Sequence, residues 1–164
     1  MALNTYILLL RAVNVGGLSL PMEQLRQIAR DCGLHRPRTL IQSGNLLVDS
    51  ECSGPEVQQR LEAALARTVG PIPVLLRTGP ELRQLLLDNP FPEADPKKLL
   101  LLFLPNAVEP QELVGPGGEE VRFHGRELFV HYPEGMGRSK LKLPWADQGT
   151  GRNLNTVVRL VAML

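Results

Sequence analysis

The first 77 residues alternate between two kinds of apolar pattern, and this alternation restricts the fold more than any other feature of the sequence. Short apolar runs predict four strands, at residues 5–11, 38–42, 46–49 and 72–77. Two longer segments carry apolar side chains every three or four positions, the period of a helix with one buried face, at residues 21–33 and 53–70. The predicted order is therefore β-α-β-β-α-β, the order of a ferredoxin-like unit.

Turn and cap residues support this order. Ser43, Gly44 and Asn45 separate the second and third apolar runs, and glycine and asparagine tolerate the backbone angles of a tight hairpin turn. Pro21 suits the first position of the first helix, because the N–H that proline lacks is unbonded there in any case. Gly33 is a natural end for the same helix.

The second half repeats these patterns less regularly. The spacing of Thr78 and Glu81 predicts a capping box for a short helix. A strand is expected at residues 98–105, one helical turn at 109–113 and a hairpin at 121–132. The last segment predicts a helix with one apolar face, formed by Leu154, Val157, Val158, Val161 and Leu164.

These patterns predict an α+β fold made of two ferredoxin-like (β-α-β-β-α-β type) halves, of which the second is degenerate. The expected first half covers residues 1–77, and the second covers residues 78–164 and ends in the C-terminal helix. No connecting segment is rich enough in glycine or serine to act as a long flexible linker, so we expect the halves to pack together.

The composition, 43% hydrophobic and 21% charged, is typical of a globular protein. No apolar run approaches the roughly 18 residues of a membrane span. The N-terminus also lacks the basic region and cleavage site of a signal peptide, so we expect a cytoplasmic protein without membrane association. The two cysteines, Cys32 and Cys52, are too few for a disulfide framework, and Cys32 is expected to be a buried free thiol on the first helix.

Metal binding and catalysis find little support in the sequence. His35, His124 and His131 lack the spacing of metal ligands. His124 and His131 lie on opposite arms of the second predicted hairpin, where an exposed pair across the strands is expected. Glu119 and Glu120 are predicted to lie solvated in a loop. We therefore expect no metal and no cofactor, and the sequence assigns neither a catalytic residue nor a reaction.

Positive charge gathers near the C-terminus. Residues 135–164 hold five Arg or Lys side chains against Asp147 alone, whereas residues 51–134 carry a net charge of −5. This asymmetry is consistent with a solvated basic surface and with attraction for an anionic partner.

One stretch of this basic region, GMGRSK at residues 135–140, has the composition of an anion-binding loop. It is not a P-loop, because the lysine and serine come in the wrong order and the spacing is too short. Gly135 and Gly137 nevertheless let the backbone approach a ligand closely or adopt positive φ. Arg138 and Lys140 add a planar fork and a point charge for phosphate or carboxylate.

A second polar stretch, GTGRNLNTV, follows at residues 149–157. The residues predicted in the first turn of the last helix are Arg152, Asn153, Asn155 and Thr156. An arginine at this positive end of a helix is unfavourable by roughly 0.3–1 kcal/mol, so an internal carboxylate or a bound anion is expected nearby. Capping of the helix by Asn153 or Thr150 is the structural alternative.

The motifs LLRAVNVGG, IQSGNLLVDS, NPF, HYPEGMGRSKL and GRNLNTV together resemble a bacterial family known as domain of unknown function 1697, over residues 4–162. The resemblance implies an α+β fold with two ferredoxin-like halves and brings no activity with it. It marks as recurrent polar positions Arg11, Asn14, Gly16, Gly17, Gln42, Ser43, Gly44, Asn45, Gly135, Arg138, Ser139, Lys140, Arg152, Asn153, Asn155 and Thr156. The chain departs from the family at Gly151, where a threonine is usual, and at Leu154, where a tryptophan is usual.

The leading hypothesis is therefore a protein that binds a small anionic or phosphorylated, nucleotide-like ligand through loops rich in Arg, Lys and Asn. The candidate ligand-binding residues are Arg11, Asn14, Gly16, Gly17, Gln42, Ser43, Asn45, Gly135, Gly137, Arg138, Ser139, Lys140, Arg152, Asn153, Asn155 and Thr156. Binding of single-stranded nucleic acid is an alternative, for which Phe129 and Tyr132 are candidate stacking residues. A purely structural or protein-interaction role for the polar motifs is another. The oligomeric state is open.

Overall fold

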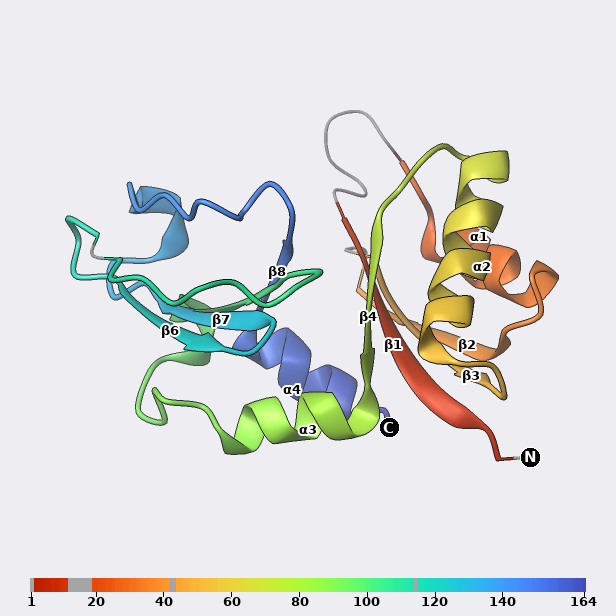
Figure 1. Cartoon of the computed structure of the whole chain (residues 1–164), viewed down its shortest axis with the longest axis horizontal. Helices are drawn as coiled ribbons and strands as arrows, with labels where there is room; N and C mark the ends of the chain where they lie inside the picture. The colour runs from red at the N-terminus through yellow and green to blue at the C-terminus, as the bar shows by residue number, and fades with distance from the viewer. Residues whose placement is uncertain (1, 12–18, 42–43, 114) are drawn as a thin grey trace. The chain divides into compact units, whose positions relative to one another are not determined.

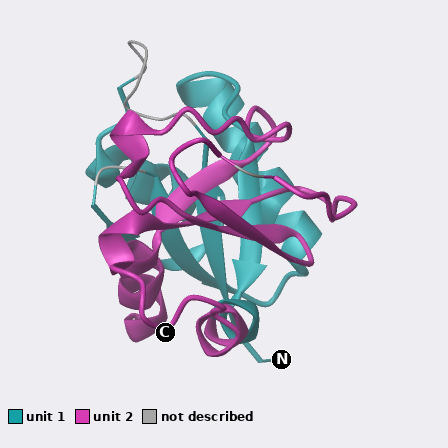
Figure 2. Cartoon of the chain, turned by 90° about the vertical axis from the view of Figure 1, so that its left-hand side faces the viewer, with its two compact units in different colours: residues 1–82, 164 teal, residues 83–163 magenta. Residues whose placement is uncertain are grey.

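The computed structural model describes residues 2–11, 19–41, 44–113 and 115–164. It divides into two compact units, residues 1–82 together with Leu164 and residues 83–163 (Figure 2). The described residues form a mixed α+β structure with two four-stranded antiparallel sheets and four α-helices (Figure 1). No helix in these ranges is long and apolar enough to cross a membrane.

The first unit has the element order that its apolar pattern predicts. The elements are β1 (Asn4–Leu10), α1 (Met22–Asp31), β2 (His35–Leu40), β3 (Asn45–Ser50), α2 (Gly54–Thr68) and β4 (Val74–Thr78). The strands lie in the order β2-β3-β1-β4, with all neighbours antiparallel. Both helices lie on one face of this sheet (Figure 1). There Leu8 and Val48 of the sheet share a core with Leu25 of α1 and Leu61 of α2.

The ends of the two helices follow the predicted signals with one shift. The Ser53 side chain accepts a hydrogen bond from the Glu56 backbone N–H at 3.4 Å and caps α2. Gly33, at φ +87°, follows the end of α1 as expected. Pro21, however, is the N-cap of α1 and not its first helical residue, and it supplies no side-chain cap.

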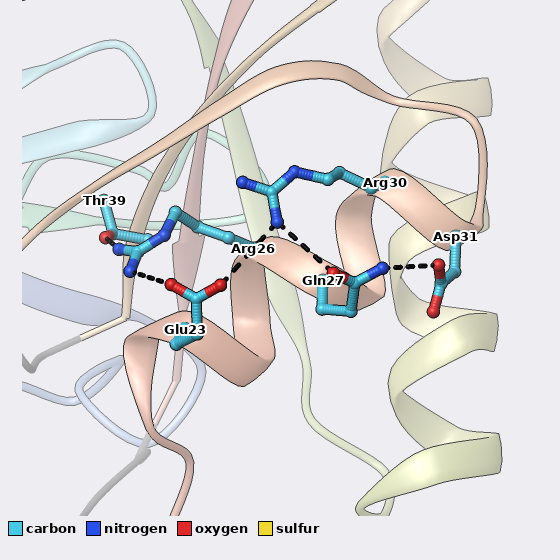
Figure 3. A network of polar contacts seen from close by, with 6 residues as sticks. All are labelled: Glu23, Arg26, Gln27, Arg30, Asp31 and Thr39. Carbon is cyan, nitrogen blue, oxygen red and sulfur yellow. Dashed lines mark hydrogen bonds and ion pairs between the residues drawn. The ribbon is translucent and has the colours of Figure 1, made fainter.

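The outer surface of α1 is held by polar pairs one turn apart (Figure 3). The Arg26 guanidinium donates to the Glu23 carboxylate at 2.6 Å and to the Thr39 hydroxyl of β2. This contact with Arg26 holds the pKa of the Glu23 carboxyl below its usual value. On the next turn Gln27 donates to Asp31 at 2.8 Å. The network ties α1 to its neighbouring strand and neutralises the charges on this surface.

The second unit contains β5 (Leu99–Phe103), β6 (Glu120–His124), β7 (Glu127–His131), β8 (Thr150–Asn153) and α4 (Leu154–Ala162), with short 3-10 turns η1 (Pro96–Lys98) and η2 (Met136–Arg138). Helix α3 (Gly79–Leu87) begins in the first unit and ends in the second. The strand order is β6-β7-β5-β8, again antiparallel throughout. Helix α4 packs against β5 and β8.

The two sheets repeat one arrangement. In each, the first strand along the chain lies third in the sheet, the second lies first, the third lies second and the fourth lies fourth. In the first unit α1 connects β1 to β2 and α2 connects β3 to β4. The corresponding segments of the second unit, residues 104–119 and 132–149, contain no α-helix where the structure describes them. The helical turn predicted at residues 109–113 is accordingly absent.

Two further predictions for the second unit are corrected. Strand β8 was not predicted, because its four residues, Thr-Gly-Arg-Asn, show no alternation of apolar and polar side chains. The predicted apolar face of α4 is rotated, since Leu154, Val157 and Leu160 are buried while Val158 is 46% exposed. The rotation follows from packing against β5 and β8, which the helix sequence does not encode.

The strand-to-helix corners after β4 and β8 are equivalent. Arg77 lies opposite Ile7 of β1, and Arg152 lies opposite Leu101 of β5, so each occupies the same place in its sheet. Each guanidinium donates to the backbone carbonyl of the residue before it, at 2.9 Å to Leu76 and 3.0 Å to Gly151.

A cap residue and a helix follow at each of these corners. Thr78 and Glu81 exchange the hydrogen bonds of the predicted capping box at the start of α3. The Asn153 side chain accepts from the Thr156 backbone N–H at 2.9 Å at the start of α4. Corresponding residues in the two halves therefore build corresponding corners.

Candidate functional site

The candidate site is the segment Gly135–Lys142, called here the basic segment, which leaves the end of β7. Its start is fixed by backbone bonds: the Tyr132 N–H donates to the Lys98 carbonyl at 2.8 Å, and the Gly135 N–H donates to the Tyr132 carbonyl at 2.9 Å. The Lys98 ammonium also donates to the Pro133 carbonyl at 3.1 Å. Gly135 adopts φ +85° and ψ 152°, a backbone region that is essentially restricted to glycine.

Side chains alternate in exposure along the basic segment and beyond it. Arg138, Lys140 and Lys142 are exposed, whereas the residues between them are half-buried. Leu141 and Leu143 pack against the core of the second unit together with Trp145. A period of two residues is that of an extended chain with one face on a core. The segment therefore presents a row of cations on an apolar support.

A buried carboxylate anchors the middle of the row. The Ser139 hydroxyl donates to Glu119 Oε1 at 2.8 Å and accepts from the Leu141 N–H at 3.1 Å. The other oxygen, Oε2, accepts from the Gly117 N–H at 2.9 Å. The bond from Ser139 holds the pKa of the Glu119 carboxyl below its usual value. Glu119 is 6% exposed, so the prediction that it lies solvated is wrong; nothing in the Glu-Glu pair distinguishes the buried carboxylate.

The exposed cations have no partner within the described part of the chain. No hydrogen bond or ion pair joins the side chains of Arg138, Lys140 or Lys142 to those residues, and the backbone N–H groups of Lys140 and Lys142 are also unbonded there. Several other arginines are paired, as on α1 in Figure 3 and at Asp49, which accepts from Arg36 and Arg38 at 3.0 Å each. These cations are therefore available to an external anion.

Gly137 and Lys142 differ from expectation in opposite ways. Gly137 has no positive φ, and a Cβ added there would meet no atom within 4 Å, so the structure requires no glycine at this position. Lys142 was not among the predicted site residues, although it continues the exposed row. The alternation of lysine and leucine from residue 140 to 143 was the signal that pointed to it.

The second predicted group lies at the junction of β8 and α4. Arg152 lies in β8 and not in the first turn of α4, so the dipole argument for a bound anion does not apply to it. It is 7% exposed, donates to the Thr150 hydroxyl at 2.6 Å, and burial lowers its pKa to about 10. Asn153 caps α4 and Thr156 donates to it at 3.0 Å, while Asn155 is exposed. The structural alternative for Asn153 is confirmed.

In the first unit, Asn45 is fully buried and donates to the Leu40 carbonyl at 3.1 Å across the β2–β3 hairpin. Arg11 is half-buried just after β1, and its N–H donates to the Pro73 carbonyl at 3.0 Å. The remaining predicted site residues lie outside the described residues: Asn14, Gly16, Gly17, Gln42 and Ser43. Of the described candidates, Gly135, Gly137, Arg138, Ser139 and Lys140 fall within the basic segment, and Arg152, Asn153, Asn155 and Thr156 lie at the junction of β8 and α4.

The histidines do not form a metal site. The described residues contain no group of three or more His, Cys, Asp or Glu that is arranged to hold a metal ion. His124 lies opposite Glu127 and His131 lies opposite Glu120, at the two ends of the β6–β7 hairpin, so the predicted pair across the strands is wrong. His124 Nε2 instead lies 2.9 Å from a carboxylate oxygen of Asp88, and this bond raises the pKa of His124.

A cavity of about 320 Å³ in the second unit does not suit an anion. Its lining includes Glu112, Glu119 and Glu120 against Arg122, and Arg122 is paired with Glu120 at 3.0 Å. Carboxylates outnumber cations on its wall, so a phosphate there would be repelled. The basic segment is the better candidate.

Comparison with known proteins places the chain in a family. Residues 3–129 match the family described as "Protein of unknown function (DUF1697)", and the chain belongs to this family. A conserved bacterial protein, SP0830 from Streptococcus pneumoniae, has a similar solved structure, with a TM-score of 0.80 and 25% sequence identity over 99% of both chains. No curated protein matches the chain.

Proposed function

We propose that this chain binds an anionic, phosphate-bearing ligand through the basic segment. One observation carries the proposal: Arg138, Lys140 and Lys142 are exposed within five residues and have no partner in the described part of the chain. Arginine contacts phosphate oxygens through a planar fork and lysine through a point charge, so the row combines both modes. The Ser139–Glu119 contact holds the backbone beneath it in place.

The strength of such binding is limited by solvent. Exposed ion pairs contribute about 0.2–1 kcal/mol each. Three of them together contribute at most about 3 kcal/mol, which corresponds to a dissociation constant of several millimolar at the tightest, since 1 mM corresponds to about −4.1 kcal/mol. A ligand with several phosphates gains more, because each added phosphate reaches another cation.

We also infer that both units are variants of the ferredoxin-like fold, the second without its two connecting helices. The shared strand order and the matching corners at Arg77 and Arg152 support this inference. A bacterial, cytoplasmic setting belongs to the same proposal. It is supported by the free thiols of Cys32 and Cys52, which suit a reducing compartment, and by the similarity to a bacterial protein.

The test is titration with pyrophosphate followed by calorimetry and by the fluorescence of Trp145, the only tryptophan of the chain. We expect saturable binding by the native protein and loss of at least tenfold in affinity in the triple variant Arg138→Ala/Lys140→Ala/Lys142→Ala. The native side chains at all three positions are exposed, so we expect the substitutions to leave the folded state unchanged.

A matched control separates the site from net charge. The triple variant Arg83→Ala/Lys97→Ala/Arg159→Ala removes the same charge from exposed positions elsewhere in the second unit. We expect it to bind pyrophosphate like the native protein. Equal binding by the native protein and the basic-segment variant would remove the proposal.

A further inference from the structure

We infer that the ligand of the basic segment is the backbone of single-stranded nucleic acid, laid along residues 138–142. The inference rests on the proposed function above and names its substrate class. It starts from the arrangement of the cations, which stand in a row and do not converge on one point. Arg138 ends the 3-10 turn η2 and Ser139 after it is extended, so Arg138 and Lys140 are about 6.6–6.8 Å apart along the chain, and Lys142 follows two residues further on.

Such a row suits a linear polyanion better than one compact phosphate. In a stacked single strand the charges recur about every 3.4 Å along the axis, so a linear polyanion offers a phosphate to each cation of the row. The half-buried Leu141 and Leu143 hold the backbone to the core and keep the cations on the solvent side.

The backbone of the row adds neutral donors. The N–H groups of Lys140 and Lys142 have no bond to the described residues, and in an extended chain they point toward the same edge. Backbone N–H groups are common donors to phosphate oxygens in nucleic-acid complexes. Lys140 and Lys142 therefore each offer a phosphodiester chain both a cation and a neutral backbone donor.

Recognition of bases is not part of this inference. All seven aromatic side chains are buried or half-buried, including Phe129 at 1% and Tyr132 at 7% exposure, the two residues predicted as stacking candidates. Trp145 packs edge-on against Phe123, with ring centroids 5.5 Å apart. Without an exposed ring for stacking, binding is expected to depend on the phosphates and to be insensitive to base identity.

An acidic peptide added as a strand fits the segment less well. Strand addition requires a continuous row of backbone donors and acceptors, and ordinary strands are about five or six residues long. In this segment the Ser139 N–H is bonded to the Met136 carbonyl, the Leu141 N–H is bonded to the Ser139 hydroxyl and Pro144 has no N–H, so the described residues offer no continuous row of donors here. A nucleic-acid backbone does not need this longer ladder.

The experiment measures the affinity of the full chain for fluorescent oligothymidylates of four, eight and sixteen nucleotides, with pyrophosphate and an oligoglutamate of sixteen residues as comparisons. Affinity is expected to rise with oligonucleotide length and to be the same for oligoadenylates. At low salt, the logarithm of the binding constant should fall against the logarithm of salt concentration with a slope of about −2, since each neutralised phosphate contributes about −0.7 for single strands.

Single substitutions test whether Arg138, Lys140 and Lys142 are the residues responsible for this salt dependence. Arg138→Ala, Lys140→Ala and Lys142→Ala should each make the slope shallower by about 0.7, whereas Lys97→Ala should leave it unchanged. Pyrophosphate binding that is lost in the basic-segment variant, without any gain in affinity with oligonucleotide length, would overturn this inference and leave the proposed function standing. Equal affinity for oligoglutamate and oligothymidylate would also overturn it. Failure of both pyrophosphate and oligonucleotides to bind would remove both proposals.

Discussion

Two glycines of the basic segment, Gly135 and Gly137, stand two residues apart and have different roles. Gly135 adopts φ +85° and ψ 152° where the chain turns out of β7, and its N–H closes that turn onto the Tyr132 carbonyl. Gly137 lies in η2 without a positive φ and with open space around its Cα. At the residue scale, the direction of the basic segment thus depends on one of these glycines and not on the other.

The substitution Gly135→Ala is expected to lower the free energy of unfolding by about 1–3 kcal/mol, because a side chain is strained in this backbone region. Gly137→Ala is the control and is expected to be neutral or to stabilise by about 0.4–1 kcal/mol, because alanine restricts the unfolded chain. Urea unfolding of the two variants measures both values. Equal stability of the two variants would contradict the conclusion that the turn out of β7 requires glycine at residue 135 and not at residue 137.

At the element scale, the polar residues at the junction of β8 and α4 have different structural roles although they belong to one sequence motif. Arg152 ends on the buried side of the strand, Asn153 caps the helix, and Asn155 in its first turn is exposed. Asparagine side chains two positions apart therefore have unequal effects on stability. The first satisfies a helix N–H that has no partner within the helix. The second is exposed and makes no hydrogen bond to the described residues.

We expect Asn153→Ala to cost about 1 kcal/mol of stability, the usual value for the loss of a helix cap. Asn155→Ala is expected to be neutral or to stabilise by a few tenths of a kcal/mol, because alanine is the better helix former. Thermal unfolding of both proteins compares them directly. If Asn155→Ala were the more damaging change, Asn155 would have a role that its exposed position does not reveal.

At the scale of the whole molecule, the two units are related by more than strand order. Leu8 of β1 and Leu102 of β5 occupy the same register position, and each belongs to the core on the corresponding face of its sheet. In the first unit that face is covered by α1 and α2. In the second unit Leu141, Leu143 and Trp145 cover it from an irregular segment. The basic segment thus occupies the chain position that a helix holds in the first unit.

The equivalence of the two corners makes a prediction for Arg77 and Arg152, which are 1% and 7% exposed. Replacing either with alanine is expected to cost about 3 kcal/mol or more, because bonds to a buried charged group are lost and a void is left. Methionine keeps most of the volume and is expected to be less damaging than alanine at both positions. Exposed Arg83 is the control, for which alanine should change stability by less than about 0.5 kcal/mol.

Denaturant unfolding of the five variants gives these values. A clear loss at one corner combined with no loss at the other would contradict the equivalence of Arg77 and Arg152. Similar losses at both would support the proposal that the second unit is a reduced form of the first.

The sequence alone determined those features that depend on short-range patterns. Apolar runs and helical periodicity predicted β1 to β4 with both helices between them. Thr78 and Asn153 were predicted as caps, because a cap bonds to residues only two or three positions away. The row of cations was also readable in part, since Arg138 and Lys140 belong to one local motif.

Only the tertiary structure decided which polar residues are buried. Glu119 and Ser139 are twenty positions apart, and only their contact makes one carboxylate internal while Glu120 stays exposed. Arg152 reads as a free cation in sequence, yet pairing of β8 with β5 buries it. Burial depends on contacts between distant segments, which no local pattern records, and it determines which charges serve the fold and which are available to a ligand.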